Sequence, residues 1–211
     1  MFRASVEYQP VQADDDPTAA RILETAIEVI ATRGYHGTSV RDIAQAANVS
    51  AGSIYNHYES KQGLLDVIIN RGMDGLLAVS EQALYDAPAN PVDRLDALVA
   101  AHVRAHAGYG PWSSIGNAEL RSLEPPRLAV VVAKRDTQQR MFDRVITDGV
   151  TQGLFVTPDP AMAAKYVVTA CTSVAGWYRI GGRLDLDELI EQYQVISRNA
   201  VGYRGGQAGQ P

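Results

Sequence analysis

The sequence predicts an all-α protein of about nine helices, and three observations support this prediction. Apolar residues recur every three to four positions along most of the 211 residues, which is the period of an amphipathic helix. Capping residues or prolines precede these segments, and glycines follow several of them. The strand-like, β-branched run at 128–133 lies inside one of the longer helical patterns.

Four helices are expected before Pro88, and each starts at a residue that caps or fits the first turn. These starting residues are Pro17, Thr38, Ser50 and Ser60. Gly34 ends the first helix, and the third is expected over residues 51–58. The fourth helix is long, although Gly72 and Gly75 lower its helix propensity.

Five more helices are expected between Pro91 and about residue 201. The predicted segments are 91–106, 112–123, 126–152, 160–181 and a last one that begins after Asp185. Asp185 and Glu188 form a capping-box pattern at that start. The terminal segments 1–16 and 204–211 show no helical period, and we expect a flexible arm and a flexible tail.

Composition excludes several functional classes. Cys171 is the single cysteine, so an intrachain disulfide and a multi-cysteine zinc site are both excluded. The longest apolar run is far shorter than the roughly 20 residues of a membrane span, and no signal-peptide pattern begins the chain. We therefore expect a cytoplasmic protein without a membrane partner.

Catalysis and metal binding are not predicted either. No Ser-His-Asp, Cys-His or paired-carboxylate spacing is present, so we expect no enzyme, no catalytic residue and no cofactor. His102 and His106 have a helical spacing that suits a metal, but no further histidine or cysteine follows to complete a ligand set. We predict that this pair is structural.

The second and third helices have the spacing of a helix-turn-helix unit, which places the start of its second helix in the DNA major groove. The turn between them is expected at residues 47–50, and Ala44, Ala47 and Ala51 are small enough to let the two helices cross closely. The third helix then presents an uncharged, hydrogen-bonding surface.

Four segments of this region resemble the DNA-binding signature of the TetR/AcrR family of transcriptional regulators. They are Arg21 to Tyr35, Thr38 to Ala44, Val49 to Tyr58, and Ser60 to Leu65. The resemblance covers residues 20–68. Ile30 and Tyr58 stand where the family has or often has Phe, and both keep a bulky core residue.

The resemblance implies a DNA-binding domain at 17–62, a ligand-binding and dimerisation domain at 63–203, and a set of DNA contacts. Its phosphate contacts fall on Thr38, Tyr55, His57 and Lys61. Its base-edge contacts fall on Ser50, Ala51, Gly52, Ser53 and Asn56. Arg41 is either a further backbone contact or part of a solvated face.

The net charge of −5 does not exclude DNA binding, because residues 1–16 hold one arginine and four acidic residues. The segment from Arg33 to Lys61 contains three basic residues and two acidic ones. With so few cations, we expect weak non-specific affinity and a shallow dependence of DNA affinity on salt.

The resemblance further implies a homodimer that pairs the helices near 126–152 and 160–181, and a small-molecule effector. Residues 176–184 and 188–193 are similar to actinobacterial regulators of fatty-acid and sterol breakdown within the family, which respond to acyl-CoA thioesters. The ligand-contact candidates are Trp112, Arg121, Trp177 and Tyr178. Solvated or core positions are the alternative for each of them.

These observations predict a ligand-responsive regulator, acting as a repressor, that binds a pseudo-palindromic operator as a dimer and is released by a small hydrophobic effector. The alternative is an architectural or activator DNA-binding protein without an effector. A ligand-induced change in melting temperature distinguishes the two.

Overall fold

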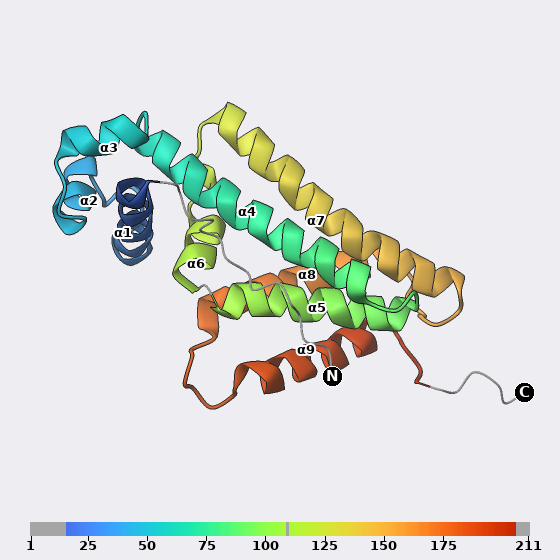
Figure 1. The fold of residues 1–211 in the computed structure, drawn as a ribbon. Coiled ribbons are helices and arrows are strands. Elements are labelled where there is room, and N and C mark those ends of the chain that lie inside the picture. The colour runs from blue at the N-terminus through green and yellow to red at the C-terminus, as the bar shows by residue number, and fades with distance from the viewer. Residues whose placement is uncertain (1–15, 109, 206–211) are drawn as a thin grey trace, which may run out of the picture. The chain divides into compact units, whose positions relative to one another are not determined.

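The computed structural model describes residues 16–108 and 110–205 of the chain. Within those ranges the protein contains nine α-helices, one 3-10 turn and no strand (Figure 1), so the all-α prediction is confirmed. The elements are α1 Pro17–Arg33, α2 Val40–Ala46, α3 Ala51–His57, α4 Lys61–Asp86, α5 Pro91–Gly108, α6 Gly110–Ala118, η1 Leu120–Ser122, α7 Pro125–Thr151, α8 Pro160–Trp177 and α9 Leu186–Ala200. No helix among the described residues is long and apolar enough to cross a membrane.

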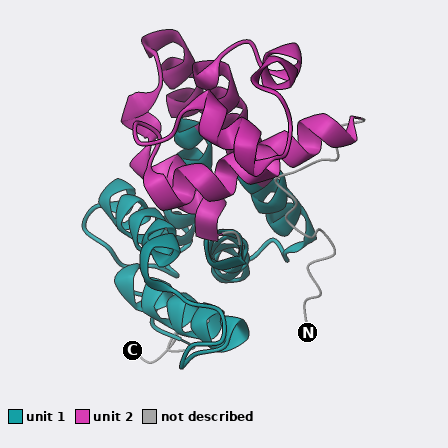
Figure 2. Cartoon of the chain, turned by 90° about the vertical axis from the view of Figure 1, so that its left-hand side faces the viewer, with its two compact units in different colours: residues 1–7, 76–108, 135–211 teal, residues 8–75, 109–134 magenta. Residues whose placement is uncertain are grey.

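The chain divides into two compact units, which Figure 2 shows in different colours. Of the described residues, unit 1 contains 76–108 and 135–205, and unit 2 contains 16–75 and 110–134. Helices α4 and α7 therefore each contribute residues to both units. The predicted arm lies outside the described residues except for Asp16, and so does most of the predicted tail.

Two predicted helix ends in unit 2 are wrong. The N-cap of α2 is Ser39 and not Thr38, because Ser39 and Asp42 form a capping box in which each side chain accepts the other's N–H. The Thr38 hydroxyl instead donates to the carbonyl of Gly34 at 2.8 Å. The helix predicted at 112–123 starts at Gly110 and is divided into α6 and η1.

The predicted end of α8 near residue 180 is also wrong. The helix stops at Trp177, where the Tyr178 N–H donates to the Val174 carbonyl at 2.9 Å. Gly181 has a φ of 77° and belongs to the connection that follows. By contrast, Asp185 and Glu188 form the predicted capping box at the start of α9.

The core of unit 2 forms where α1, α2, α3 and α6 pack with the first half of α4. Its fully buried side chains include Ile22, Leu23, Ile43, Ile54 and Leu64. The Tyr58 ring is buried in this core, and its hydroxyl donates to the carbonyl of Ala19 at 3.0 Å. The apolar positions of the DNA-binding signature are thus the residues that hold α3 on its supporting helices.

The core of unit 1 forms around α5, which packs against both α8 and α9 (Figure 1). Leu95, Phe142 and Val167 are among its fully buried residues. Cys171 is also buried here, and burial raises the pKa of its thiol to about 12, so the group is an unreactive thiol at neutral pH.

Candidate nucleic-acid interface

Helices α2 and α3 form the predicted helix-turn-helix. The turn between them is built by Ala47, whose N–H donates to Ile43, and by Asn48, which adopts a left-handed φ of 53°. Val49 closes the turn by donating to the Ala44 carbonyl at 3.0 Å. The Ser50 hydroxyl then caps α3 by accepting the Ser53 N–H at 3.0 Å.

The structure places the predicted base-contact residues on and around one exposed face of α3. Ile54 is buried against the other helices of unit 2, which turns Gly52, Tyr55 and Asn56 outward. The Tyr55 side chain is 55% exposed, whereas the equally large Tyr58 is buried. Ser50 is also exposed, while Ala51, Ser53 and His57 are half-buried at the edges of this face.

Gly52 has no structural reason within the described chain to be glycine. A Cβ at this position would meet only the Ser50 hydroxyl, at an ordinary 3.7 Å. Neither backbone strain nor crowding within the described residues explains why this position is a glycine. A glycine does, however, allow another molecule to approach the backbone closely.

Lys61 is not an extended cation at the start of α4. Its ammonium donates to the Tyr35 carbonyl at 2.5 Å and lies 3.9 Å from the centroid of the Tyr35 ring. Partial burial lowers the pKa of Lys61, while the nearby carboxylates of Glu119 and Asp42 act in the opposite direction. The bond to Tyr35 uses one of the three N–H groups of the ammonium and holds the partly buried side chain against that residue.

Two other predicted phosphate contacts have partners within unit 2. The Thr38 side chain is buried, so the exposed hydroxyl at the start of α2 belongs to Ser39. The Ser39-x-x-Asp42 capping pattern in the sequence is the signal that identifies this residue. The His57 ring lies 3.7 Å from the Asp16 carboxylate, and Asp16 caps α1 by accepting the Thr18 N–H.

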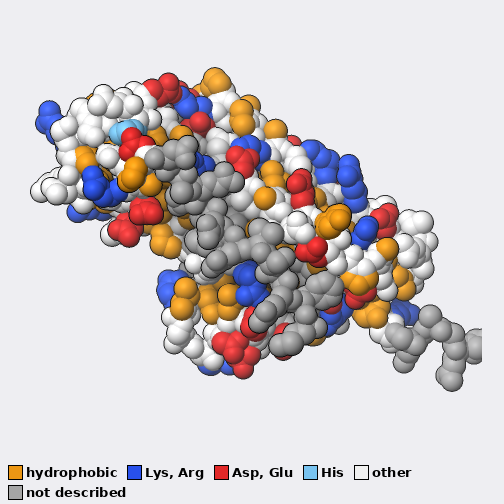
Figure 3. Space-filling model, viewed as in Figure 1, with side chains coloured by type: hydrophobic (Ala, Val, Ile, Leu, Met, Phe, Trp, Pro, Cys, Tyr) orange, Lys and Arg blue, Asp and Glu red, His pale blue; other side chains and the backbone are white. Residues whose placement is uncertain are grey.

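Charge around the interface is mixed. Arg41 is exposed on α2, and the guanidinium of Arg33 lies 4.0 Å from the Asp42 carboxylate. On the face drawn in Figure 3, basic and acidic side chains are interspersed rather than gathered into one basic patch. The arrangement supports DNA contacts made by neutral hydrogen-bonding groups more than by ion pairs.

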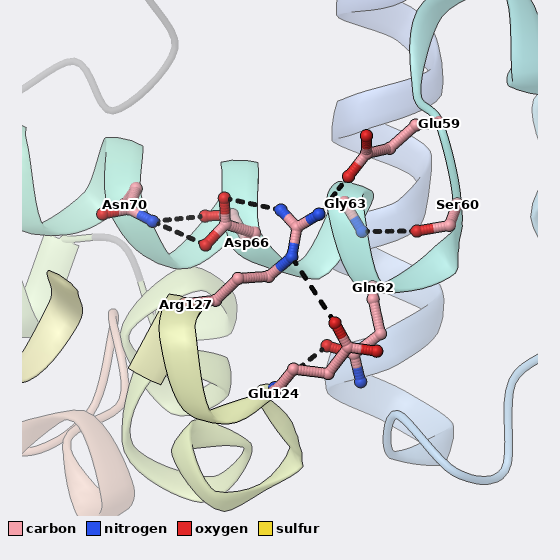
Figure 4. Close-up of polar contacts among 8 residues, drawn as sticks. All are labelled: Glu59, Ser60, Gln62, Gly63, Asp66, Asn70, Glu124 and Arg127. Carbon is pink, nitrogen blue, oxygen red and sulfur yellow. Dashed lines mark hydrogen bonds and ion pairs between the residues drawn. The ribbon is translucent and has the colours of Figure 1, made fainter. Parts of the chain in front are cut away.

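Arg127, at the start of α7, forms ion pairs within unit 2 that the sequence patterns did not predict. Its guanidinium pairs with Glu59, which lies just before α4, and with Asp66 in α4 at 3.1 Å (Figure 4). Gln62 adds a hydrogen bond from α4 to the carbonyl of Ser122. These contacts join segments about sixty residues apart in the sequence, and they hold the junction between α3 and α4 in place.

The predicted ligand-contact residues fall into different parts of the structure. Trp112 is buried in unit 2, where its indole N–H donates to the Ile68 carbonyl at 2.7 Å. Arg121 is exposed on η1 in the same unit. Trp177 and Tyr178 are neighbours in unit 1, where the half-exposed Trp177 ring stacks on Tyr193 with centroids 6.5 Å apart.

An open groove of about 410 Å³ lies between α4 and α7 within unit 2. Its lining includes Asp66, Asp74, Arg127 and Val130, and none of the four predicted ligand-contact residues. Lys134 and Arg127 are paired with the groove's acidic residues, so the polar groups at its edge are largely neutralised.

A chain that contains a helix-turn-helix in one helical unit and a second, separate helical unit has the architecture of a DNA-binding transcriptional regulator. Residues 22–68 match the family described as "Bacterial regulatory proteins, tetR family", and residues 88–201 match "Tetracyclin repressor-like, C-terminal domain". The chain belongs to the TetR family, whose members are regulators and not enzymes.

Similar proteins of known name or structure support this assignment. The chain is 29% identical to the transcriptional repressor KstR2 of Mycobacterium tuberculosis over 186 residues, which cover 87% of this chain and 92% of that protein. A tetR-family regulator from Rhodococcus RHA1 has a TM-score of 0.84 at 33% identity, covering 90% of this chain and 99% of the other. AibR in complex with isovaleryl coenzyme A and operator DNA has a TM-score of 0.79 at 26% identity, covering 89% and 100%.

Proposed function

We propose that the protein is a ligand-responsive repressor that acts in the cytoplasm, binds a pseudo-palindromic operator as a homodimer, and releases it when a small hydrophobic effector binds. The observation that carries the proposal is the outward face of α3, where Gly52, Tyr55 and Asn56 are exposed over a buried Ile54. The domain division expected from the sequence, 17–62 for DNA and 63–203 for ligand and dimerisation, is part of the proposal.

Base readout in this proposal depends on the first turn of α3. Ser50, Ala51, Gly52 and Ser53 surround that turn, and Asn56 has an amide that can pair with adenine in the major groove. Tyr55 and His57 contact phosphates from the flanks, with Arg41 as a further cation. Ser39 takes the place of Thr38 as the hydroxyl at the start of α2, and Lys61 contributes the N–H groups of its ammonium that Tyr35 does not use.

The proposed dimer interface uses α8, as the sequence suggested, together with α9 instead of α7. Large apolar side chains are exposed on α8 at Met162 and Tyr166 and on α9 at Val195 and Ile196. The unit 1 part of α7 instead exposes polar residues such as Arg140 and Arg144. An apolar surface of this kind is buried favourably against a second copy of itself.

An acyl-CoA thioester is the proposed effector class. The support is the similarity to AibR, whose structure contains both isovaleryl coenzyme A and operator DNA. Trp177 and Tyr178 remain candidates for its contacts in unit 1, while Trp112 and Arg121 belong to unit 2. A ligand releases DNA only if it binds the released state more tightly than the DNA-bound state.

Fluorescence anisotropy of a labelled duplex from upstream of the protein's own gene tests the proposal. We expect this duplex to bind more tightly than a scrambled duplex, and isovaleryl coenzyme A, but not coenzyme A, to weaken the binding. Equal affinity for both duplexes contradicts a sequence-specific regulator. If acyl-CoA thioesters bind the protein and leave operator affinity unchanged, the ligand-responsive part is wrong and an architectural role remains.

A further inference from the structure

Four helices of unit 1 bring a polar side chain to one place in an otherwise apolar core. The side chains are Ser80 from α4, His102 from α5, Gln138 from α7 and Thr172 from α8, and all but Thr172 are fully buried. His106 follows His102 by one turn of α5, and the two rings lie 4.6 Å apart. Buried polar groups are costly unless they are hydrogen-bonded, so each of these needs a partner.

The hydrogen bonds within this cluster determine which of its groups donate and which accept. The Gln138 amide nitrogen donates to the Ser80 hydroxyl at 3.0 Å and faces His102 Nδ1 at 3.3 Å. His102 Nδ1 must therefore accept, which leaves the proton on Nε2 to be donated to the Thr172 hydroxyl at 2.9 Å. The Ser80 hydroxyl in turn donates to the Leu76 carbonyl.

Two atoms of side chains that contact His102 have no partner in this network. Gln138 Oε1 and His106 Nδ1 are both buried, and neither has a hydrogen-bond partner among residues 16–108 and 110–205. Their side chains are only 3% and 8% exposed, so solvent does not satisfy them. Burial lowers the pKa of His106 to about 4, which keeps its ring neutral and leaves Nδ1 able to carry a proton.

We propose that Gln138 and His106 bind an uncharged hydroxyl or carboxamide group in the part of a ligand that enters the apolar core of unit 1. Gln138 Oε1 accepts the hydrogen of that group, and His106 Nδ1–H donates to its oxygen. The proposal rests on the proposed function and deepens it, because it assigns the polar contacts of the effector in unit 1.

The chemistry of the two atoms selects this class of ligand. A carboxylate offers only acceptor oxygens and cannot pair with Gln138 Oε1, and an ether has no hydrogen to donate. An ammonium group would lose its hydration in an apolar core, and it would be repelled by the positive charge of Arg135, which acts on both histidines. A secondary amide, such as those in the pantetheine arm of an acyl-CoA, and the hydroxyl of an alcohol both supply one donor and one acceptor.

Entry of a ligand requires side chains at the cluster to move, because its polar atoms are closed to solvent in this structure. Met141 follows Gln138 by about one helical turn and is only partly buried against the same core. Its unbranched side chain can adapt to a new neighbour, so Met141 is a candidate for such a movement.

Isothermal titration calorimetry of the full chain without DNA tests the proposal. The probes are 1-octanol, octanamide, octanoate and methyl octyl ether, which share one alkyl chain and differ in the head group. We expect the alcohol or the amide to bind the wild type about tenfold more tightly than the acid and the ether, as for one lost hydrogen bond. Which of the two binds better shows whether the natural group is a hydroxyl or an amide.

Two variants test whether Gln138 Oε1 and His106 Nδ1 cause the difference in affinity between the probes. Gln138→Met and His106→Phe should each weaken the binding of the preferred probe by about tenfold. The control Gln152→Met, at an exposed glutamine after α7, should leave the dissociation constant of that probe unchanged. Circular dichroism checks that each variant is folded, and the head-group series on the wild type remains decisive if one is not.

Affinity that is independent of the head group, or absence of binding by every probe, overturns the proposal. Unchanged binding of the preferred probe by folded Gln138→Met and His106→Phe overturns it as well. Because no DNA is present, these results are independent of whether the protein binds an operator.

Discussion

The indole of Trp112 covers Gly72, so that a Cβ at position 72 would overlap the indole nitrogen. The same nitrogen donates to the carbonyl of Ile68, one turn earlier in α4. The glycine that lowers the helix propensity of α4 is therefore the residue that lets α6 pack closely on it. Both residues belong to unit 2, whose core supports the helix-turn-helix.

Gly72→Ala should destabilise the protein by about 1–3 kcal/mol, because the added methyl group displaces the Trp112 ring and strains its hydrogen bond. Urea unfolding followed by circular dichroism measures the change. Gly116→Ala in α6 is the matched control, because a Cβ there meets no atom within 4 Å. Equal effects of the two substitutions would show that helix propensity, and not packing against Trp112, determines the result.

Local patterns in the sequence predicted most of the fold, because helix ends and amphipathic faces depend on residues a few positions apart. Asn90 and Asp185 cap the helices that the sequence predicted. The wrong prediction of Thr38 as the N-cap of α2 has a local cause. Thr38 and Ser39 are adjacent hydroxyl residues that could both cap the helix, and only Ser39 is followed three positions later by Asp42, which completes the capping box. Trp112 over Gly72 was not predictable, because it depends on tertiary packing between α4 and α6.

Arg127→Met should loosen the junction between α3 and α4. The substitution removes the ion pairs to Glu59 and Asp66 while keeping an unbranched side chain (Figure 4). We expect faster amide hydrogen exchange in the first turns of α4 and α7, and severalfold weaker operator binding because α3 is less firmly held. Arg144→Met, at an exposed position of α7, is the control. Unchanged exchange at the start of α4 would show that these ion pairs do not hold the junction.

Folding stability should decrease as the pH falls from 6.5 towards 5. Burial is the first cause that lowers the pKa of both His102 and His106, and the charge of Arg135 adds to it. Both folded-state values lie below the ordinary 6.5, so within this range the unfolded chain binds protons that the folded chain excludes. Each ring then contributes a loss that approaches about 1.4 kcal/mol per pH unit once the pH is well below 6.5.

Urea unfolding at a series of pH values measures this dependence. His106→Phe should reduce the slope between pH 6.5 and 5 to about half, because one of the two buried imidazoles is removed. A wild-type stability that stays constant over that range would contradict the assignment of neutral rings packed beside Gln138 and Thr172.

Tyr166→Asp should convert the protein from dimer to monomer and weaken its binding to a two-half-site operator. Tyr166 is 56% exposed and belongs to the apolar face proposed for the dimer, where a carboxylate would be buried without a partner. Sedimentation velocity measures the assembly state. Tyr85→Asp is the matched control, because Tyr85 is 85% exposed on α4. A Tyr166→Asp protein that remains dimeric would place the interface elsewhere.

The candidate interface was predictable only in part. The signature residues identified α3, because Tyr55 and Asn56 lie at the exposed positions of a short amphipathic segment. The sequence did not predict that Lys61 folds back on Tyr35, since the two residues are 26 positions apart and give no local signal. The polar cluster around His102 was likewise not predicted, because four separate helices contribute to it.

Sequence-specific binding through α3 is the central claim, and a comparison of two duplexes tests it most directly. The dissociation constants of wild type and Asn56→Ala are measured by anisotropy on the upstream duplex and on a scrambled duplex over a range of salt concentrations. We expect the wild type to prefer the upstream duplex, Asn56→Ala to lose about tenfold or more of that preference, and the salt dependence to correspond to only a few phosphate ion pairs per dimer. An undiminished preference in Asn56→Ala, together with a steep salt dependence, would contradict the account.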